Sequence, residues 1–524
     1  MSFDYIIVGG GSAGCVLANR LSEDENNRVL LLEAGGTHQS IWVQIPFLTT
    51  ATLPYWFKNW HYFTTPQSGF NGRVGYQPRG KILGGSSAIN AMIYIRGQQE
   101  DYNEWAAVTS KEWTFDSVLP TFKKLEHNER LNGALHGQQG ELAVSDILYP
   151  NVASQAFIDS ANALGYPLND DFNGEHQMGA GMYQVTQKNG LRHSSADAFL
   201  NPVMARKNLT ILTKAHTMKL IFSGKRCTGV DVRVNGKTQQ FLAKKRVILA
   251  AGAINSPQLL LLSGVGPKDE LKALDISLVH DLPGVGKNFH DHPDYVHCYS
   301  SSHKDLLGLS PSGIWDMLKA YMHYRQGKPS FMSTNFAEAG AFICSDKEMT
   351  RPDLQLHFVP GIVDNHARNW HFKRGFSCHV CVLRPKSRGA VTLQSADPFK
   401  APLIDPNFLG DDSDLDLLIK GYKLTEAIMT HEKMSHYQAK PLYKASSDDE
   451  ILGLIKSRAD TVYHPVGSCR MGNDEMAVVS PHLEVHGIEG LSVVDASVMP
   501  SVVSGNTNAP TMMIAEKAAA WMLG

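Results

Sequence analysis

The segment from Asp4 to Glu33 constrains the fold more than any other part of the chain. A short apolar run, Tyr5–Val8, ends in the pattern G-x-G-x-x-G, and apolar residues then recur at helical spacing up to Leu21. A second apolar run, Val29–Leu32, closes on Glu33. This order of strand, glycine turn, helix, strand and acid predicts a βαβ unit of the Rossmann type.

Each glycine of this motif occupies a position with a physical requirement. Gly9 allows the tight turn, Gly11 lets the backbone approach a pyrophosphate, and Gly14 lets the helix pack on the strand. The free N–H groups of the helix start attract phosphate, and Glu33 can accept from a ribose hydroxyl. An acid at this position disfavours a 2′-phosphate, so NADP is the least expected ligand. We predict a dinucleotide site formed by Gly9, Gly11, Ser12, Ala13, Gly14, Glu33 and Ala34.

Length and composition predict an ordinary globular protein with more than one domain. The chain has 524 residues, of which 43% are hydrophobic and 19% charged, and its net charge is −2. The chain has no excess of basic residues that would attract nucleic acid, so we expect no nucleic-acid partner. The first predicted strand begins too early to leave room for a cleavable signal, and no apolar run reaches about 18 residues. We expect a cytoplasmic protein and leave open peripheral contact with the inner face of the membrane.

Cysteine and histidine patterns predict no metal site. Seven scattered cysteines are typical of a reducing compartment, and Cys378 and Cys381 form a single C-x-x-C inside a strand-like run. His290 and His292 form a close pair but lie in a segment better explained by a structural motif described below. The remaining histidines, including His357 and His366, have no ligand spacing.

Strand–turn–helix segments recur far apart, at 80–95, 246–266 and 491–521. In 353–363 and 376–393, apolar and polar residues alternate, as they do in half-exposed strands. We therefore predict an α/β fold with a Rossmann-type domain built from discontinuous segments and an α+β, sheet-and-helix, substrate-binding domain. The first domain comprises 1–155, 190–295 and 456–524, and the second 156–189 and 296–455.

Two of these segments resemble the first glycine motif, because small residues form a turn before an expected helix. Residues 79–90 read RGKILGGSSAIN, where small residues let a backbone pass close to a flat ring or a phosphate. We expect a helix to open there, and a simple helix cap at Ser86 or Ser87 is the alternative reading. Residues 252–266 follow a predicted strand, with a helix expected from about Pro257 to Gly264.

In this order the segments resemble the diagnostic blocks of the glucose–methanol–choline (GMC) oxidoreductase family. Gly284–Pro293 is similar to the family's G-V-G-x-N-x-x-D-H-P element, and Tyr463–Gly472 resembles its catalytic histidine segment. Residues 493–510 resemble its closing strand and active-site turn, so the resemblance spans nearly the whole chain. Residues 355–361 and 383–389 look most like bacterial alcohol and choline dehydrogenases.

The resemblance implies that the first domain binds FAD rather than NAD. Some family members attach FAD covalently through a histidine at the position of Ile89, so we expect non-covalent binding here. The positive end of the helix running towards Met513 and Trp521 would face the flavin. Further FAD contacts implied by the resemblance are Gly84, Gly85, Ser86, Asn90, Ala91, Met92, Ala251, Gly252, Asp495, Ala496, Asn506 and Thr507.

The resemblance also places a catalytic base at His464 and a partner at Asn506. Histidine suits a base that removes a hydroxyl proton near neutral pH, and an amide can orient the alcohol oxygen. We expect oxidation of a primary alcohol to the aldehyde, with hydride passing to flavin N5. A helix-cap role for Asn506 is an alternative that does not exclude the first.

Several functional alternatives remain at this point. Electrons would leave to a quinone or another acceptor, or to oxygen in an oxidase that makes hydrogen peroxide. Choline is a weaker substrate candidate, because the sequence shows no carboxylate and aromatic cage for a cation. A redox-neutral lyase or decarboxylase and a flavin-binding regulatory protein are more distant readings. The aromatic-rich segment 41–63 is either a lid over an apolar channel or a covering loop.

Overall fold

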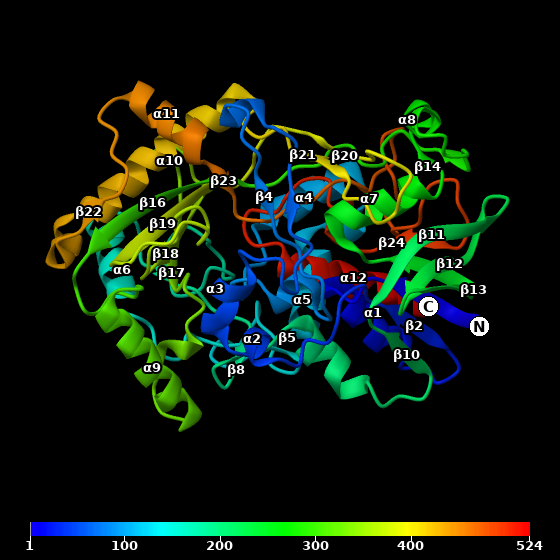
Figure 1. Ribbon diagram of the computed structural model, residues 1–524, viewed down its shortest axis with the longest axis horizontal. Coiled ribbons are helices and arrows are strands. Elements are labelled where there is room, and N and C mark those ends of the chain that lie inside the picture. The colour runs from blue at the N-terminus through cyan, green and yellow to red at the C-terminus, as the bar shows by residue number, and fades with distance from the viewer. Residues whose placement is uncertain (1) are drawn as a thin grey trace.

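Two seven-stranded sheets organise the chain and lie towards opposite ends of its long axis (Figure 1). The structure is a computed structural model, and it describes residues 2–524. Helices and loops from distant parts of the sequence fill the space between the sheets (Figure 1). The predicted fold class, an α/β Rossmann-type unit with a second sheet-and-helix unit, is confirmed.

The first sheet is assembled from segments that are far apart in the sequence. Its strand order is β10-β2-β1-β13-β12-β11, and β24 pairs with the carboxyl-terminal end of β13. The pairs of β1, β2, β10, β13 and β24 are parallel, whereas β11 and β12 form an antiparallel extension. The bounds are β1 Ser2–Val8, β2 Val29–Leu32, β10 Leu209–Leu212, β11 Ala215–Ser223, β12 Arg226–Val234, β13 Lys237–Leu249 and β24 Leu491–Val493.

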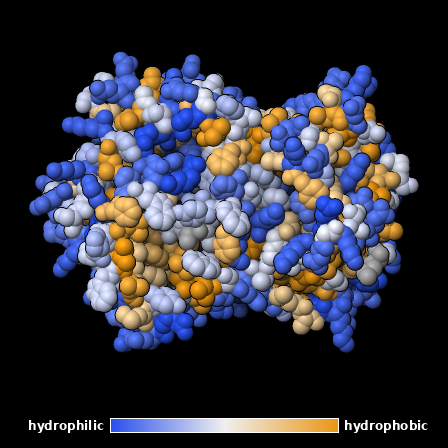
Figure 2. Space-filling view, viewed as in Figure 1, coloured by the Kyte–Doolittle hydropathy of each residue, from blue (hydrophilic) through white to orange (hydrophobic). Residues whose placement is uncertain are grey.

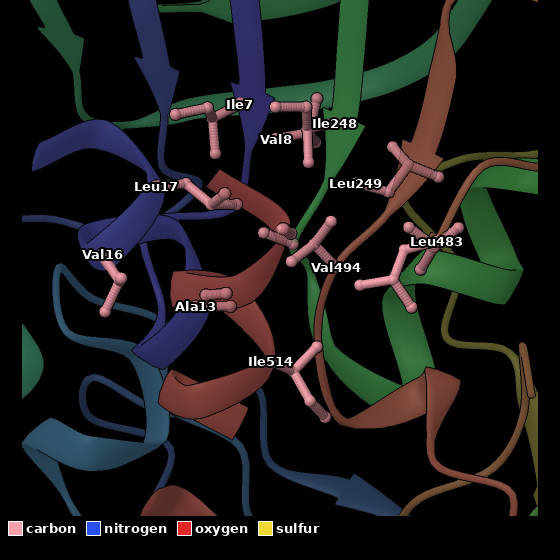
Figure 3. Packing of buried hydrophobic residues seen from close by; sticks show 14 of the residues in the cluster. Ile7, Val8, Ala13, Val16, Leu17, Ile248, Leu249, Leu483, Val494 and Ile514 are labelled. Atoms are coloured by element: carbon pink, nitrogen blue, oxygen red, sulfur yellow. The ribbon is translucent and has the colours of Figure 1, made fainter. Parts of the chain in front are cut away.

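Helices α1 (Ser12–Leu21) and α12 (Asn508–Leu523) pack against each other beneath this sheet. Figure 3 shows Ala13 and Leu17 of α1 close to α12. Most of α12 is apolar and buried, as expected of a helix enclosed on all sides. A buried ion pair also joins the two helices, because Arg20 Nε lies 2.8 Å from Glu516 Oε2.

The second sheet is antiparallel, and its two faces have different characters. Its order is β22-β16-β19-β18-β17-β7, with β23 also paired to β16. One face packs on α6 and α10 through an apolar core, and the opposite face carries polar residues such as Gln355 and His379. The bounds are β7 Gly179–Met182, β16 Pro293–Ser301, β17 Ala339–Ile343, β18 Leu354–Val359, β19 Arg374–Val382, β22 Lys440–Pro441, β23 Asp460–Thr461, α6 Val152–Ala163, α9 Pro311–Arg325, α10 Asp412–Thr430 and α11 Asp448–Arg458.

Shorter elements connect the two sheets. Among residues 2–524, no helix is long and apolar enough to cross a membrane. The connecting elements are α2 Ile41–Gln44, α3 Thr49–Thr52, β3 Tyr62–Phe63, β4 Tyr76–Gln77, α4 Gln99–Val108, α5 Phe115–Leu125, β5 Glu126–Asn128, β6 Leu142–Val144, β8 Gln187–Lys188, β9 Leu191–Arg192, α7 Gly252–Leu262, β14 Val265–Gly266, α8 Lys268–Ala273, β15 His280–Asp281, β20 Ala390–Thr392 and β21 Leu403–Asp405.

Two expected helices differ from the structure. The segment 79–90 forms only a 3₁₀ turn, Gly85–Ala88, rather than the start of a longer helix. Helix α7 begins at Gly252, before the expected Pro257, which lies inside it. A proline leaves the carbonyl four residues earlier without its helical donor, and the Ser468 hydroxyl donates to that Ala253 oxygen at 2.5 Å.

The predicted domain limits differ slightly from the sheet membership of the strands. Strand β16 begins at Pro293, before the predicted boundary at residue 296. Strand β23 (Asp460–Thr461) pairs with β16, although the prediction assigned 456–524 to the first domain. This pairing matters for the site, because it joins the segment before β16 to the segment after β23.

Candidate active site

The glycine loop after β1 is held by a second glycine pair. Gly9 has φ +107°, and a Cβ on Gly14 would lie 1.9 Å from the Gly9 carbonyl oxygen. A Cβ on Gly85 would lie 2.6 Å from the Cα of Gly11, and the Gly84 N–H donates to the Gly10 carbonyl at 2.7 Å. Side chains at these positions would separate the two loops, so the close approach requires glycine.

Glu33 is buried and fastens the same loop. Its carboxylate accepts from the backbone N–H groups of Gly10 at 2.9 Å and Gly35 at 2.7 Å. Burial raises its pKa to about 7, while the hydrogen bonds from Gly35 and Gly10 and the charge of Lys81 act in the opposite direction. The predicted ribose acceptor therefore also positions the loop.

A cavity of about 280 Å³ lies against these loops and extends to the predicted catalytic residues. Two predicted contacts, Gly14 and Gly84, do not line it and instead pack the loops behind it. The predicted residues that do line it are Gly9, Gly11, Ser12, Ala13, Glu33, Ala34, Gly85, Ser86, Asn90, Ala91, Met92, Ala251, Gly252, His464, Asp495, Ala496, Asn506 and Thr507.

Asp495 joins two chain segments at the wall of the cavity. It accepts from the Gly252 N–H at 2.9 Å, the Ser256 hydroxyl at 2.6 Å and the Ser497 N–H at 2.8 Å. Burial raises its pKa, and these donors oppose the shift. The loop after β24 is thereby fixed to the start of α7, which places Ala496 at the cavity.

The donor set fits FAD. The first turns of α1 and α12 contain no acidic residue, so the positive ends of both helices are free to face an anionic group. The Ser12 hydroxyl donates to Asn508 Oδ1 at 2.7 Å, which links the two helix starts beside the cavity. Glycine backbone, helix N-termini and a buried acid are what a dinucleotide requires.

His464 lies at the other end of the cavity, where two hydrogen-bonding partners hold its ring. Its Nε2 is 3.1 Å from Asn506 Nδ2, and its Nδ1 is 3.1 Å from His292 Nδ1. Burial lowers the pKa of His464 well below its usual 6.5, and the neighbouring His292, His357 and Arg79 act in the same direction. The imidazole is therefore neutral at pH 7.

Asp291 and His292 belong to the site, although the sequence indicated only a structural motif there. Asp291 Oδ1 accepts from the backbone N–H groups of His464 at 2.7 Å and His292 at 2.8 Å. Burial raises its pKa to about 6, with Thr461 and Arg79 opposing. Gln355 is a further unpredicted residue, and its Nε2 lies 3.3 Å from Asn506 Oδ1.

A second polar cluster lies close to the His464 loop. Donor atoms of Asp294, His366 and His379 all lie within 4.8 Å of one another, a grouping that sequence spacing did not reveal. His379 Nδ1 is 2.7 Å from Asp294 Oδ2, whereas Asp294 Oδ1 has no hydrogen-bond partner among the described residues. The ring of His366 lies 5.0 Å from that of Tyr463, centroid to centroid, which connects the cluster to the His464 loop.

The aromatic-rich segment 41–63 reaches both the cavity and the surface. Leu53 and Trp60 line the cavity, whereas Trp56 is 76% exposed and Tyr55 and Phe57 are also exposed. The segment thus covers one wall of the cavity, and its role as a moving lid stays a prediction.

Cys378 and Cys381 are buried free thiols in β19.

Comparisons with known proteins show the family of the chain. The GMC oxidoreductase sequence models match residues 3–294 and 385–515. The chain belongs to the GMC oxidoreductase family. An alcohol dehydrogenase [acceptor] from Pseudomonas putida is 47% identical, over 99% of this chain and 95% of that protein. The mitochondrial choline dehydrogenase of Mus musculus is 40% identical, over 99% and 89% of the two chains.

Solved structures show the same GMC architecture. A formate oxidase from Aspergillus oryzae, in a study of FAD modification, superposes with a TM-score of 0.91 at 27% identity. The match covers 99% of this chain and 98% of that one. The predicted family, the FAD cofactor and an FAD-dependent enzyme acting on alcohols are confirmed.

The contact between the two glycine loops gives a direct test of cofactor retention. We expect Gly85→Ala to purify with little FAD, because the new Cβ would push the turn away from Gly11. Gly453→Ala is the matched control, since nothing lies within 4 Å of a Cβ built there. Flavin absorbance per protein measures the effect. Full FAD content in Gly85→Ala would contradict the assignment.

Proposed function

We propose that this GMC enzyme oxidises a primary alcohol to the aldehyde, with His464 as the base and Asn506 as the residue that orients the oxygen. The observation that supports this most strongly is the His464–Asn506 pair, 3.1 Å apart, at the wall of the cavity that fits FAD. A hydroxyl that binds beside the pair from the cavity, in place of the hydrogen bond between them, would meet a proton acceptor and an amide donor together.

The state of His464 suits this role. Because its pKa is held well below 6.5, its neutral form predominates at pH 7 and can take the hydroxyl proton directly. When bound, FAD supplies the acceptor for the hydride that leaves the same carbon. Ile89 lines the cavity and offers no nucleophilic atom, which supports non-covalent FAD binding.

Replacing the base tests the proposal. We expect His464→Ala to lower the rate of flavin reduction by an alcohol by about 100-fold or more, because general-base catalysis contributes that much. The measurement is loss of the flavin absorbance after anaerobic mixing. His482→Ala, at an exposed histidine paired with Glu112, is the control. A near-normal rate in His464→Ala, with FAD retained, would refute the role.

The substrate body is a separate part of the proposal. Apolar wall residues such as Leu53, Trp60 and Ile93 favour an alcohol with an apolar or aromatic body. Choline is a second candidate, because the buried Asp294 keeps one oxygen without a partner among the described residues, and a choline dehydrogenase is a relative. A panel of anaerobic reductions separates them. Bleaching by choline that is lost in Asp294→Asn would favour the second candidate.

The electron acceptor distinguishes a dehydrogenase from an oxidase. We propose a quinone or a similar acceptor, supported by the 47% identity to an alcohol dehydrogenase [acceptor]. We expect alcohol turnover in air to yield little hydrogen peroxide and a soluble quinone to raise the turnover rate several-fold. Peroxide in equal amount to aldehyde, with no effect of quinone, would instead identify an alcohol oxidase.

We further propose that one surface rests on a membrane, where a quinone would be available. Helix α9 exposes Ile314, Trp315, Leu318 and Met322, which lie close together on one side of the helix. Figure 2 shows hydrophobic side chains gathered over α9 at the lower left of the molecule. Such an exposed apolar surface is typical of an interaction site.

Neighbouring features support a lipid surface as the partner. Buried side chains of α9 share an apolar cluster with residues 45–48, so α9 adjoins the exposed aromatic segment. Lys319, Arg325 and Lys328 are exposed on or just beyond α9, and its one acid, Asp316, is paired with Arg374. Apolar and basic side chains together favour an anionic lipid interface.

Vesicle binding tests this surface. We expect the holoenzyme to sediment with vesicles containing phosphatidylglycerol, and the double variant Trp315→Glu/Leu318→Glu to remain in solution because charge opposes insertion. Leu242→Glu, at an exposed leucine of β13, is the control. Unchanged sedimentation of the double variant would contradict the assignment of α9.

A further inference from the structure

A second histidine closes a hydrogen-bond chain behind His464. His292 Nδ1 lies 3.1 Å from His464 Nδ1, and His292 Nε2 lies 3.0 Å from the carbonyl oxygen of Leu383. A carbonyl oxygen only accepts, so Nε2 of neutral His292 carries the hydrogen and its Nδ1 carries a lone pair. His464 Nδ1 must then be the donor between the rings, which leaves the lone pair of His464 on Nε2.

The other side of His464 gives the same result independently. Gln355 Nε2 lies 3.3 Å from Asn506 Oδ1, so the oxygen of the Asn506 amide accepts from Gln355. The amide nitrogen of Asn506 then faces His464 Nε2 at 3.1 Å as a donor. A donor in this position also requires a lone pair on His464 Nε2. Each group in this series of hydrogen bonds therefore donates to the next, in the order Gln355, Asn506, His464, His292 and the Leu383 carbonyl.

We propose that His292 is a positioning residue that fixes His464 in the Nδ1–H tautomer, so that Nε2 is the basic atom. The inference rests on the proposed function of His464. In the reaction the hydroxyl O–H bond breaks and an Nε2–H bond forms, while Nδ1 keeps its hydrogen. The resulting imidazolium still donates to His292 Nδ1, as in other sites where a third group orients the base.

The surroundings keep His292 in the form that this role requires. Burial lowers the pKa of His292 to about 4, and the charge of Arg384 also lowers it. The backbone carbonyls of Leu383 and Val503 raise the pKa but do not offset the burial. His292 is therefore neutral at pH 7 and remains an acceptor. Among the other groups that act on the pair, His357 and Arg79 disfavour charge on His464.

Backbone pairing explains why the two rings meet. Strands β16 and β23 pair Pro293 with Thr461, and His292 immediately precedes β16. The N–H groups of His292 and His464 both donate to Asp291, which holds the two residues in register. The geometry on the Nδ1 side of His464 is thus set by His292 and Asp291, which do not line the cavity themselves.

Two amide variants separate the tautomer role from simple packing. In His292→Asn, the side-chain oxygen can take the place of Nδ1 as acceptor, although the bond to Leu383 is lost. In His292→Gln, the amide can reach the Leu383 carbonyl but leaves no acceptor beside His464. The holoenzymes are compared by FAD content, melting temperature and the rate of flavin reduction at saturating alcohol, with His464→Ala in parallel.

We expect His292→Gln to reduce flavin about 100-fold more slowly, and His292→Asn to stay within about tenfold of the parent, with substrate affinity unchanged in both. Equal losses in both variants that retain FAD would overturn the inference, as would a normal rate in His292→Gln. If His464→Ala also reduces flavin normally, the proposed base itself is wrong and the inference fails with it.

Discussion

The site depends on one constraint: parallel strands β1, β13 and β24 end at the same edge of the first sheet. Each strand is followed by a segment that reaches the cavity, and these segments contain Gly11, Ala251 and Ala496. Ligands of doubly wound sheets bind beyond the carboxyl ends of such strands. Asp495 adds a physical link, because it binds the start of α7 from the loop after β24.

The second sheet contributes contacts to the His464–Asn506 end of the cavity, and the first sheet contributes the glycine loops. Its polar face presents Gln355, which contacts Asn506, and its β16–β23 pairing brings His292 beside His464. Neither sheet could form the candidate site alone. The glycine loops come from one unit, and His292, which contacts the proposed base His464, comes from the junction with the other.

The sequence predicted the parts of the site that rest on local rules. The glycine spacing from Gly9 to Gly14 and the apolar runs on either side define a βαβ unit without tertiary information. Resemblance to the GMC family then supplied His464 and Asn506, which the structure places 3.1 Å apart. The β16–β23 register and the polar cluster around Asp294 were not predictable, because they depend on pairings between distant segments. Helix α7 began earlier than expected because Ser468, far along the chain, compensates for Pro257.

The electrostatics of the buried histidines give the final step of the argument. His464, His292 and His357 all have lowered pKa values because burial disfavours their charged forms. Only one of them can readily become charged, since each positive ring would lower the pKa of the next. In the proposed reaction, a proton taken by His464 would therefore be weakly held. Asn506 and His292 restrict this brief charge to one orientation, so the site combines a weak base with a fixed geometry.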